Sequence, residues 1–168
     1  MPPPVLTTER LRFDLWSDAD FDDLYALHAD PRVQPSYAPG PEKWTRAGIA
    51  ARLAGYQDEQ ARFGFTKWRL GLHDGRFLGR AGWSPWEEGA LEIGYAIRPE
   101  DWGHGYATEA ATALTAWAHV TRPAGERLVG FARAHNLASR RVLERSGLAF
   151  VDMRDIGGLP HSFHEVRR

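Results

Sequence analysis

The stretch from Leu91 to Ala118 constrains the fold more than any other part of the chain. Leu91 to Arg98 is typical of a strand, and the loop that follows Pro99 contains two glycines. From Ala107 onward, apolar residues recur at helical spacing, and most of them are alanines, which permit close packing on a sheet. A strand, a glycine loop and a helix in this order favour an α/β fold in which the helix covers one face of a sheet.

Hydrophobic periodicity predicts the remaining elements, in the order β-α-α-β-β-β-α-β-α-β-β. Strands are predicted at Leu11–Trp16, Thr66–His73, Phe77–Trp83, Leu91–Arg98, Arg127–Arg133, Phe150–Ile156 and Ser162–Val166. Helices are predicted from the Ser17-Asp18 cap to His28, from Glu42 to Phe63, from the glycine loop to Ala118, and from Asn136 to Ser146. The turn at Asp74-Gly75 makes the three strands between 66 and 98 an antiparallel meander. Asn136 caps the last helix, and Gly147 fits the position at which it stops.

The composition bounds the domain count and the kinds of partner. The chain has 168 residues, 43% of them hydrophobic, which is enough for one compact core, so residues 1–168 are expected to form a single domain. Lys and Arg number 21 against 22 Asp and Glu, so no charge excess indicates nucleic acid or a membrane as the partner. The lack of cysteine excludes disulfides, thiolate nucleophiles and cysteine-ligated zinc. No signal peptide or membrane-spanning run occurs, so we expect a cytoplasmic protein.

The glycine loop and the start of the following helix form a candidate anion site. The first-turn amides of a helix have no partners within the helix and lie at the positive end of its dipole. Gly103 and Gly105 let a phosphate approach the main chain without meeting a Cβ atom. Other nucleotide motifs fit poorly, because the P-loop lysine is missing and the third glycine of the dinucleotide motif is replaced.

Two ordered motifs then identify the family that the chain resembles. Residues 93–109, from Ile93-Gly94-Tyr95 to Glu109, resemble motif A of the GCN5-related N-acetyltransferases (GNAT), and most closely the branch of the ribosomal-protein alanine acetyltransferases. Residues 135–150 resemble the Asn-x-x-Ser helix of that branch, and residues 6–12 are similar to its first strand. The resemblance implies a single-domain GNAT fold: a mixed, mostly antiparallel sheet of about six to seven strands, flanked by about four helices, with a splay between the central strands.

The resemblance also implies acetyl-coenzyme A as cosubstrate and assigns residues to it. The loop pattern of the family falls on residues 102–107, where Trp102 replaces the usual Gln or Arg and is expected to alter packing rather than binding. The main chain of the loop would hold the pyrophosphate, the end of the preceding strand would offer main-chain partners to the pantetheine arm, and the last helix would reach the same arm. The residues in these roles are Gly103, His104, Gly105, Tyr106, Ala107 and Thr108; Ile97 and Arg98; and Asn136 and Ser139.

Acetyl transfer needs a neutral amine, stabilisation of the developing oxyanion and a proton for the leaving thiolate. The family places its base on the strand before the splay, which indicates Glu92, and the Ile97 N–H would stabilise the oxyanion. Many relatives supply the proton from a tyrosine at the position of Leu143, so Ser139 is the substitute here. Each residue has a second interpretation: Glu92 as a solvated ion-pair residue, and Ser139 as a helix cap or cofactor contact.

The sequence therefore predicts direct transfer of an acetyl group from acetyl-coenzyme A to a primary amine, without a metal. The acceptor is either a protein N-terminus or a small molecule, and Tyr37 and Trp44 are candidates for its wall or for the core. His161 and His164 lack companions for a zinc site. Arg140 and Arg141 either form a solvated helix face or provide the cation that the 3′-phosphate of coenzyme A needs. Dimerisation is common in the branch. Because Leu143 cannot donate a proton, a catalytically idle acyl-coenzyme A sensor is the alternative.

Overall fold

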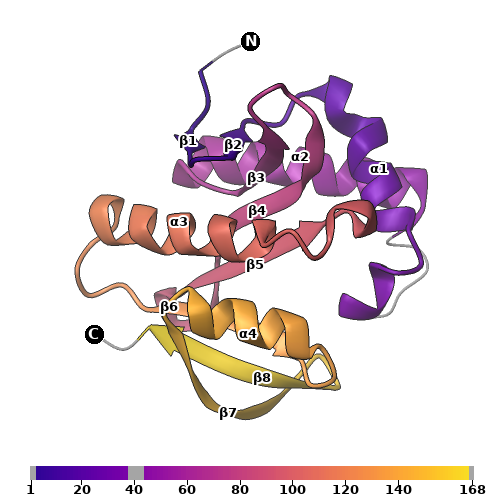
Figure 1. The fold of residues 1–168 in the computed structure, drawn as a ribbon. Coiled ribbons are helices and arrows are strands. Elements are labelled where there is room, and N and C mark those ends of the chain that lie inside the picture. The colour runs from indigo at the N-terminus through magenta and orange to yellow at the C-terminus, as the bar shows by residue number, and fades with distance from the viewer. Residues whose placement is uncertain (1–2, 38–43, 167–168) are drawn as a thin grey trace.

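The protein folds as one mixed sheet with helices on both faces, as described by a computed structural model for residues 3–37 and 44–166 (Figure 1). The strands are β1 (Leu6–Thr7), β2 (Leu11–Asp14), β3 (Lys67–Leu72), β4 (Phe77–Pro85), β5 (Leu91–Ile97), β6 (Leu128–Arg133), β7 (Leu148–Ile156) and β8 (Leu159–Val166). The longer helices are α1 (Phe21–Ala29), α2 (Arg46–Phe63), α3 (Tyr106–Thr121) and α4 (Leu137–Arg145). The predicted fold class is confirmed.

The eight strands lie in the order β1-β2-β3-β4-β5-β6-β8-β7. All neighbouring pairs are antiparallel except β5 and β6, which are parallel. These two strands pair only at Leu91 with Leu128 and at Glu92 with Val129, although β5 continues to Ile97. The predicted splay between the central strands is therefore present. The sheet has one strand more than expected, because the short β1 pairs with β2.

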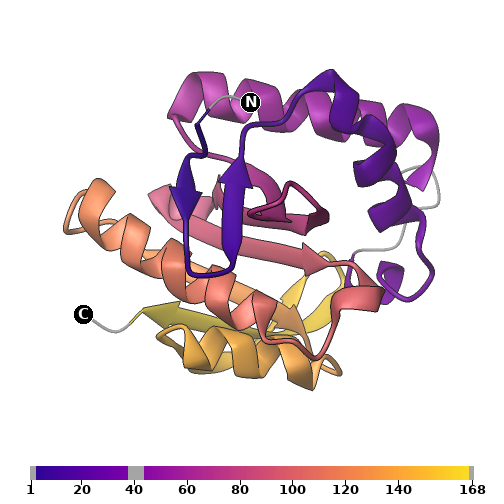
Figure 2. The same cartoon turned by 45° about the horizontal axis from the view of Figure 1, so that its top comes forward.

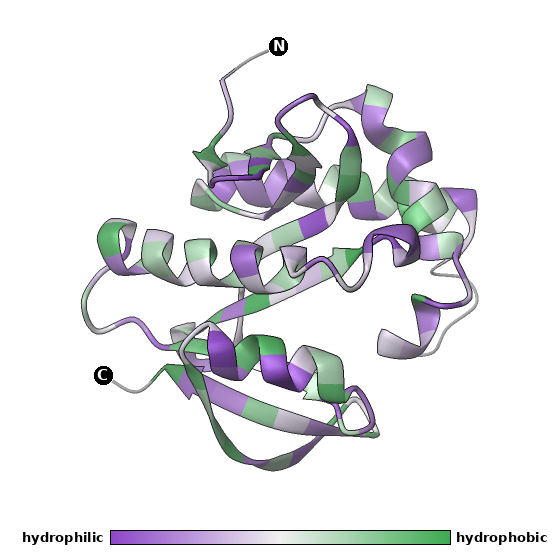
Figure 3. Ribbon diagram, viewed as in Figure 1, coloured by the Kyte–Doolittle hydropathy of each residue, from purple (hydrophilic) through white to green (hydrophobic). Residues whose placement is uncertain are grey.

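Each face of the sheet carries its own hydrophobic core. Helices α3 and α4 cover one face and α1 and α2 the other, which is visible when the two views are compared (Figures 1 and 2). On the α3 face, Trp68, Trp83 and Leu114 are fully buried, and the Trp83 indole donates to the Leu114 carbonyl at 3.1 Å. On the α1 face, Leu24 and Ile49 are fully buried. Hydrophobic and hydrophilic segments alternate along α4, as its exposed position requires (Figure 3).

Several element boundaries differ from the prediction for local reasons. The helix after Ser17 starts with a 3-10 turn at Asp18–Asp20 before α1 begins. Strand β2 ends at Asp14, and the Trp16 indole, predicted to lie in the strand, instead donates to the Lys67 carbonyl at 2.7 Å. The predicted helix start at Glu42 lies outside the described residues, within which α2 begins at Arg46.

The ends of α4 agree with the sequence. The Asn136 side chain accepts from the Ser139 N–H at 3.0 Å, and Gly147 has φ 98°, a left-handed conformation that glycine adopts without strain. Among the described helices, none has the length and apolar character that crossing a membrane requires.

Helix α3 provides a direct test of the core that holds the central strands. Leu114 is 0% exposed, so Leu114→Ala leaves a cavity and should lower the free energy of unfolding by about 2–5 kcal/mol. Val120 lies on the same helix and is 86% exposed, so Val120→Ala should change it by less than about 0.5 kcal/mol. Urea unfolding of both variants measures the difference, and equal effects would contradict the packing described here.

Candidate functional site

The splay directs main-chain groups of β5 into the gap beside β6. The Arg98 N–H donates to the Leu78 carbonyl of β4 at 2.8 Å, and the β4–β5 register is regular from there to Leu91. Because main-chain groups alternate along a strand, the N–H groups of Ile93, Tyr95 and Ile97 point toward β6. In the described residues, β6 pairs with β5 only at Leu91 and Glu92. The gap thus offers hydrogen-bond donors at the position predicted for the pantetheine arm.

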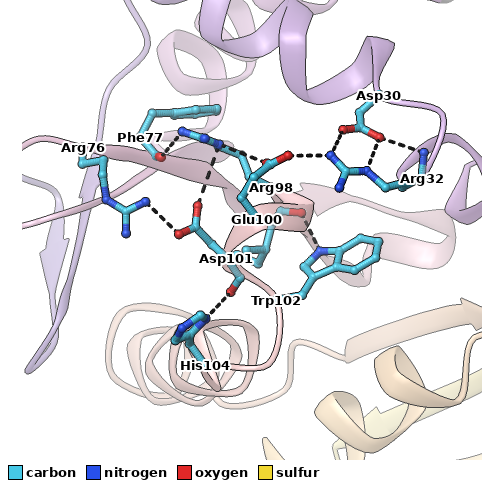
Figure 4. A network of polar contacts seen from close by, with 10 residues as sticks. Asp30, Arg32, Arg76, Phe77, Arg98, Glu100, Asp101, Trp102 and His104 are labelled. Carbon is cyan, nitrogen blue, oxygen red and sulfur yellow. Dashed lines mark hydrogen bonds and ion pairs between the residues drawn. The ribbon is translucent and has the colours of Figure 1, made fainter.

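Ile97 and Arg98, the two residues predicted at the end of β5, differ in which main-chain groups are free to bind a ligand. Both main-chain groups of Arg98 already have partners, since its carbonyl accepts from the Asp101 N–H at 2.9 Å. The Ile97 carbonyl accepts from the Trp102 indole at 2.8 Å, which gives the unusual Trp102 a structural role (Figure 4). The Ile97 N–H faces the splay, because the N–H of the next residue, Arg98, points to β4. Tyr95, which the sequence prediction did not include, presents its N–H to the same gap.

The glycine loop has the geometry of an anion cradle. Gly103 and Gly105 have φ values of 79° and 77°, and α3 begins directly after Gly105. A Cβ atom added at Gly103 would meet nothing within 4 Å, and at Gly105 its nearest neighbour would be the Arg10 guanidinium at 3.7 Å. The loop from Trp102 to Gly105 is exposed. Its amides and the positive end of α3 are therefore open to an anion from solvent.

The β1–β2 hairpin holds the start of α3 in place, and its turn lies beside α3 in Figure 2. The Glu109 carboxylate of α3 accepts from the Thr8 hydroxyl, from the Arg10 N–H at 3.0 Å and from the Arg10 guanidinium at 2.6 Å. A second arm of the same guanidinium donates to the His104 carbonyl at 3.0 Å. Arg10 thereby ties the glycine loop to the first turn of α3. This contact was not predicted, although residues 6–12 had been identified by their resemblance.

A network of charged residues anchors the other end of the loop (Figure 4). Asp101 is buried, and its carboxylate pairs with Arg76 at 2.7 Å and with Arg98 at 3.8 Å. The Asp101 carbonyl lies 3.1 Å from the Nδ1 atom of His104. Glu100 pairs with Arg98 and with Arg32, so the network reaches the segment after α1. A cavity of about 340 Å³ lies beside it, lined by α1, Phe77 and residues 98–100.

Glu92 lies on the opposite face from the glycine loop's helix and is buried there. The Lys67 ammonium donates to the Glu92 carboxylate at 2.7 Å and to the Ser84 hydroxyl at 3.0 Å. The Lys67 side chain reaches Glu92 by crossing Gly94, where a Cβ atom would lie 2.2 Å from the lysine chain. Gly94 therefore leaves room for the path that the Lys67 side chain takes to this ion pair. The pair is buried rather than solvated, which distinguishes it from the surface ion pair considered as an alternative.

Ser139 lies at the start of α4, in contact with Tyr95. The Tyr95 hydroxyl lies 2.9 Å from both the hydroxyl and the carbonyl oxygen of Ser139. Burial raises the pKa of Tyr95 above its ordinary value, so the phenol stays protonated. Asn136 uses its side chain to cap α4 and donates to the Ser36 hydroxyl at 3.2 Å. The segment after α1 thus contacts the helix predicted to reach the pantetheine arm.

The two candidate wall residues lie together on the α1 face. Tyr37 and Trp44 are partly buried, their rings lie 5.3 Å apart, and both contact the ring of His28. The Tyr37 hydroxyl accepts from Arg80 of β4 at 3.0 Å, and the Tyr37 carbonyl accepts from Arg133 of β6 at 3.2 Å. Tyr37 therefore connects the two strands on either side of β5.

The remaining candidates have structural partners. Leu143 is 1% exposed and packs in the α3 core. His161 and His164 bond to the Leu159 carbonyl and the Ser162 hydroxyl. In residues 3–37 and 44–166, no group of three or more His, Asp or Glu could hold a metal ion. Arg141 is exposed, and the Arg140 guanidinium lies 5.8 Å from the Phe150 ring.

Comparisons with known proteins agree with this geometry. The profile of the acetyltransferase (GNAT) domain matches residues 10–149. YkkB of Bacillus subtilis (strain 168) is 30% identical over 151 residues, covering 86% of this chain and 85% of YkkB. A putative GnaT-family acetyltransferase from Bordetella pertussis has a TM-score of 0.80 at 24% identity, covering 96% of this chain and 98% of that one. RimL, a ribosomal L7/L12 alpha-N-protein acetyltransferase in complex with coenzyme A, has a TM-score of 0.76 at 15% identity, covering 96% of each chain.

The hairpin clamp on α3 predicts a pH-dependent stability. Burial alone would raise the pKa of Glu109, but hydrogen bonds from Thr8 and Arg10 outweigh it and hold the pKa below its ordinary value of 4.5. The stabilisation is therefore complete above about pH 5 and is lost as the pH falls below 4.5 and through the lowered value in the folded protein. We expect Glu109→Gln to lower the free energy of unfolding by about 1–2 kcal/mol at pH 7, with a smaller difference in acid.

Urea unfolding over a pH series measures this difference. Asp58→Asn is the control, because that carboxylate is 60% exposed in a surface pair with Arg62 and should contribute little. A Glu109→Gln protein as stable as wild type at pH 7 would show that the clamp does not stabilise the fold.

Proposed function

Because the chain belongs to the family of acetyltransferase (GNAT) domains, we propose that it transfers the acetyl group of acetyl-coenzyme A directly to a primary amine. The family predicted from the motifs is confirmed, and the likeness in fold to RimL is consistent with the predicted branch. One observation carries the proposal: an unpaired strand edge and an open glycine loop stand at the two ends of one short segment, Tyr95 to Gly105. That spacing suits a ligand with an extended arm and a pyrophosphate.

The residues present fit acetyl-coenzyme A, which supplies an acyl thioester when bound. The amides of residues 103–108 would hold the pyrophosphate, because the two glycines leave open space and α3 adds the positive end of its dipole. The N–H groups of Tyr95 and Ile97 would hold the arm and the thioester oxygen. Asn136 would have to exchange its bond with Ser36 to reach the arm, whereas Ser139 already faces the splay through Tyr95.

Proton removal from the amine is assigned to Glu92. In the described residues, one carboxylate oxygen of Glu92 is bonded to Lys67, which leaves the other oxygen for a water molecule. Glu92 lies three residues before Tyr95 and five before Ile97, which is about 10 and 16 Å along an extended strand. More than one water molecule must therefore relay the proton. In the reaction the amine nitrogen bonds to the acetyl carbon, the carbon–sulfur bond breaks, and the amine proton passes through water to Glu92.

The leaving thiolate needs a proton, and Ser139 with Tyr95 is the group proposed to give it. If the Tyr95 hydroxyl donates to the Ser139 hydroxyl, the serine proton is free to point at the sulfur. If Tyr95 instead donates to the Ser139 carbonyl, the serine proton points back at the tyrosine. The protonated phenol of Tyr95 thus compensates for Leu143, which is a core residue and has no proton to give.

The acceptor is proposed to enter over Tyr37 and Trp44, opposite the cofactor loop. Within this function the acceptor is a protein N-terminus or a small-molecule amine. A location in the cytoplasm is an expectation drawn from the sequence, and a homodimer is what the resemblance to the branch implies. The second candidate, an idle acyl-coenzyme A sensor, is favoured only by the buried Leu143.

Release of free thiol from acetyl-coenzyme A tests the function directly. We expect thiol release that depends on an added primary amine, in a panel of amino acids, polyamines, aminoglycosides and short peptides with free N-termini. A Gly105→Val variant should lose affinity for acetyl-coenzyme A, because φ 77° disfavours a branched side chain there. Tight binding of acetyl-coenzyme A without release on any amine would support the sensor instead.

Glu92 can be tested once an active amine is found. Glu92→Gln should lower kcat by about 10²-fold or more at neutral pH and leave the KM for acetyl-coenzyme A nearly unchanged, since it removes the base and not a cofactor contact. The loss should shrink at high pH, where the free amine becomes abundant. Glu87→Gln, in the exposed turn after β4, is the control. Full activity of Glu92→Gln at pH 7 would reject Glu92 as the base.

A further inference from the structure

A group of aromatic and cationic side chains lies on the α1 face of the sheet without a complete set of partners. We call it the buried polar cluster. Its members are His28, Tyr37, Trp44, Arg52, Tyr56 and Arg80. They come from α1, α2, β4 and the ends of the segment between α1 and α2, so the fold gathers them from separate parts of the chain.

Arg80 is the centre of this cluster. Arg80 is 5% exposed, and its Nη2 atom donates to the Tyr37 hydroxyl at 3.0 Å. The Nε and Nη1 atoms are buried and have no hydrogen-bond partner among the described residues. In residues 3–37 and 44–166, no carboxylate forms an ion pair with Arg80. Glu92 interacts with it electrostatically, but the Glu92 hydrogen bond goes to Lys67. A buried guanidinium with free donors is costly unless a ligand satisfies it.

The neighbours of Arg80 also have buried polar atoms that lack hydrogen-bond partners in the described residues. The Arg52 guanidinium lies 6.0 and 5.9 Å from the rings of Tyr37 and Trp44, and its Nε atom is buried. In the part of the chain that the structure describes, this Nε atom, the buried Tyr56 hydroxyl and both buried ring nitrogens of His28 have no hydrogen-bond partner. Burial, followed by the charges of Arg80 and Arg52, lowers the pKa of His28 to about 2, so its ring is neutral. The cluster therefore combines two cations with neutral hydrogen-bonding groups.

The cluster lies next to the place of acetyl transfer. Arg80 is paired with Ala96 of β5, between the two residues whose N–H groups face the splay. Arg80 and Glu92 lie on the same face of the sheet. Glu92 is four residues before Ala96 on β5, a separation of about 13 Å along the strand. Gly82 and Gly94 lie opposite each other between these two positions, and the Lys67 side chain crosses Gly94 there on its way to Glu92. Because the guanidinium of Arg80 is so deeply buried, only a small acceptor can reach it, and water must bridge the remaining distance between the amine of that acceptor and Glu92.

We propose that the buried polar cluster is the acceptor's anion subsite, and that the acceptor is a small primary amine that also carries a carboxylate, as an amino acid does. The unpartnered Nη1 group of Arg80 donates to a carboxylate oxygen of the acceptor, and the guanidinium adds its positive charge. Arg52 adds a second positive charge, and the rings of Tyr37 and Trp44 form the wall. This inference rests on the proposed function for the amine end of the acceptor.

Binding of the acetylated products tests the subsite without requiring turnover. The probes are N-acetylglycine, N-acetylphenylalanine and N-acetylglutamate, each with its C-terminal amide, titrated calorimetrically with and without coenzyme A. We expect at least one acid to bind wild type at least about tenfold more tightly than its amide. Arg80→Gln should abolish that preference, and Arg80→Lys should restore part of it. Arg62→Gln, on the exposed side of α2, should leave it unchanged.

Two outcomes overturn the subsite: every acid binds like its amide, or no acid binds wild type better than Arg80→Gln. Melting temperatures check that the variants fold, and if Arg80→Gln does not, Arg52→Gln is compared with wild type in its place. The proposed function fails separately. A chain that binds acids through Arg80 but releases no thiol with any amine keeps the subsite and loses the activity. A chain that acetylates amino acid amides as well as the acids keeps the activity and loses the subsite.

Discussion

The rest of the structure depends on the parallel contact between β5 and β6 being so short. Two residue pairs hold the strands together, and beyond Glu92 they diverge. An ordinary sheet would satisfy the N–H groups of Tyr95 and Ile97 with carbonyls of the neighbouring strand. Here these groups are left for a ligand, and the sheet stays intact because β4 pairs with β5 along its whole length. Pairing with β4 in the antiparallel meander therefore holds β5 in place, while the opposite edge of β5 faces the candidate site.

The same strand separates two kinds of chemistry. Alternation along β5 sends Tyr95 toward α4 and Ser139, and sends Glu92 toward Lys67 and the α1 face. The α3 face is packed with aliphatic and aromatic residues, whereas the α1 face has charged side chains beneath α2. In the proposed reaction, the thiolate of a ligand held at this strand edge receives a proton from the face with Tyr95 and Ser139. The amine of the acceptor loses its proton on the α1 face, where Glu92 lies.

The glycine loop is held from both sides by charges rather than by apolar packing. Arg10 and Glu109 fix its end at α3, and Asp101, with Arg76 and Arg98, fixes its start. This leaves the loop residues themselves exposed, which an apolar anchor would not. Trp102 contributes by bonding to the Ile97 carbonyl, so the residue that departs from the family pattern ties the loop to the end of β5. The buried polar cluster differs, since Arg80 is buried and Arg52 partly buried, and neither forms an ion pair with a carboxylate of residues 3–37 and 44–166.

The sequence by itself determined the fold class, the order of the elements and the glycine loop. These follow from local patterns: periodicity, the Asn136 cap and the left-handed position at Gly147. The splay was expected from the resemblance of residues 93–109 to motif A of the family. It placed Glu92 on the right strand but could not reveal the Lys67 partner, which is 25 residues away in sequence and reaches it across Gly94. Only the tertiary structure brought His28, Arg52 and Arg80 together, and only it joined Arg10 to Glu109. Such contacts arise where separate elements pack, and side chains at large sequence separation leave no periodic signal in the chain.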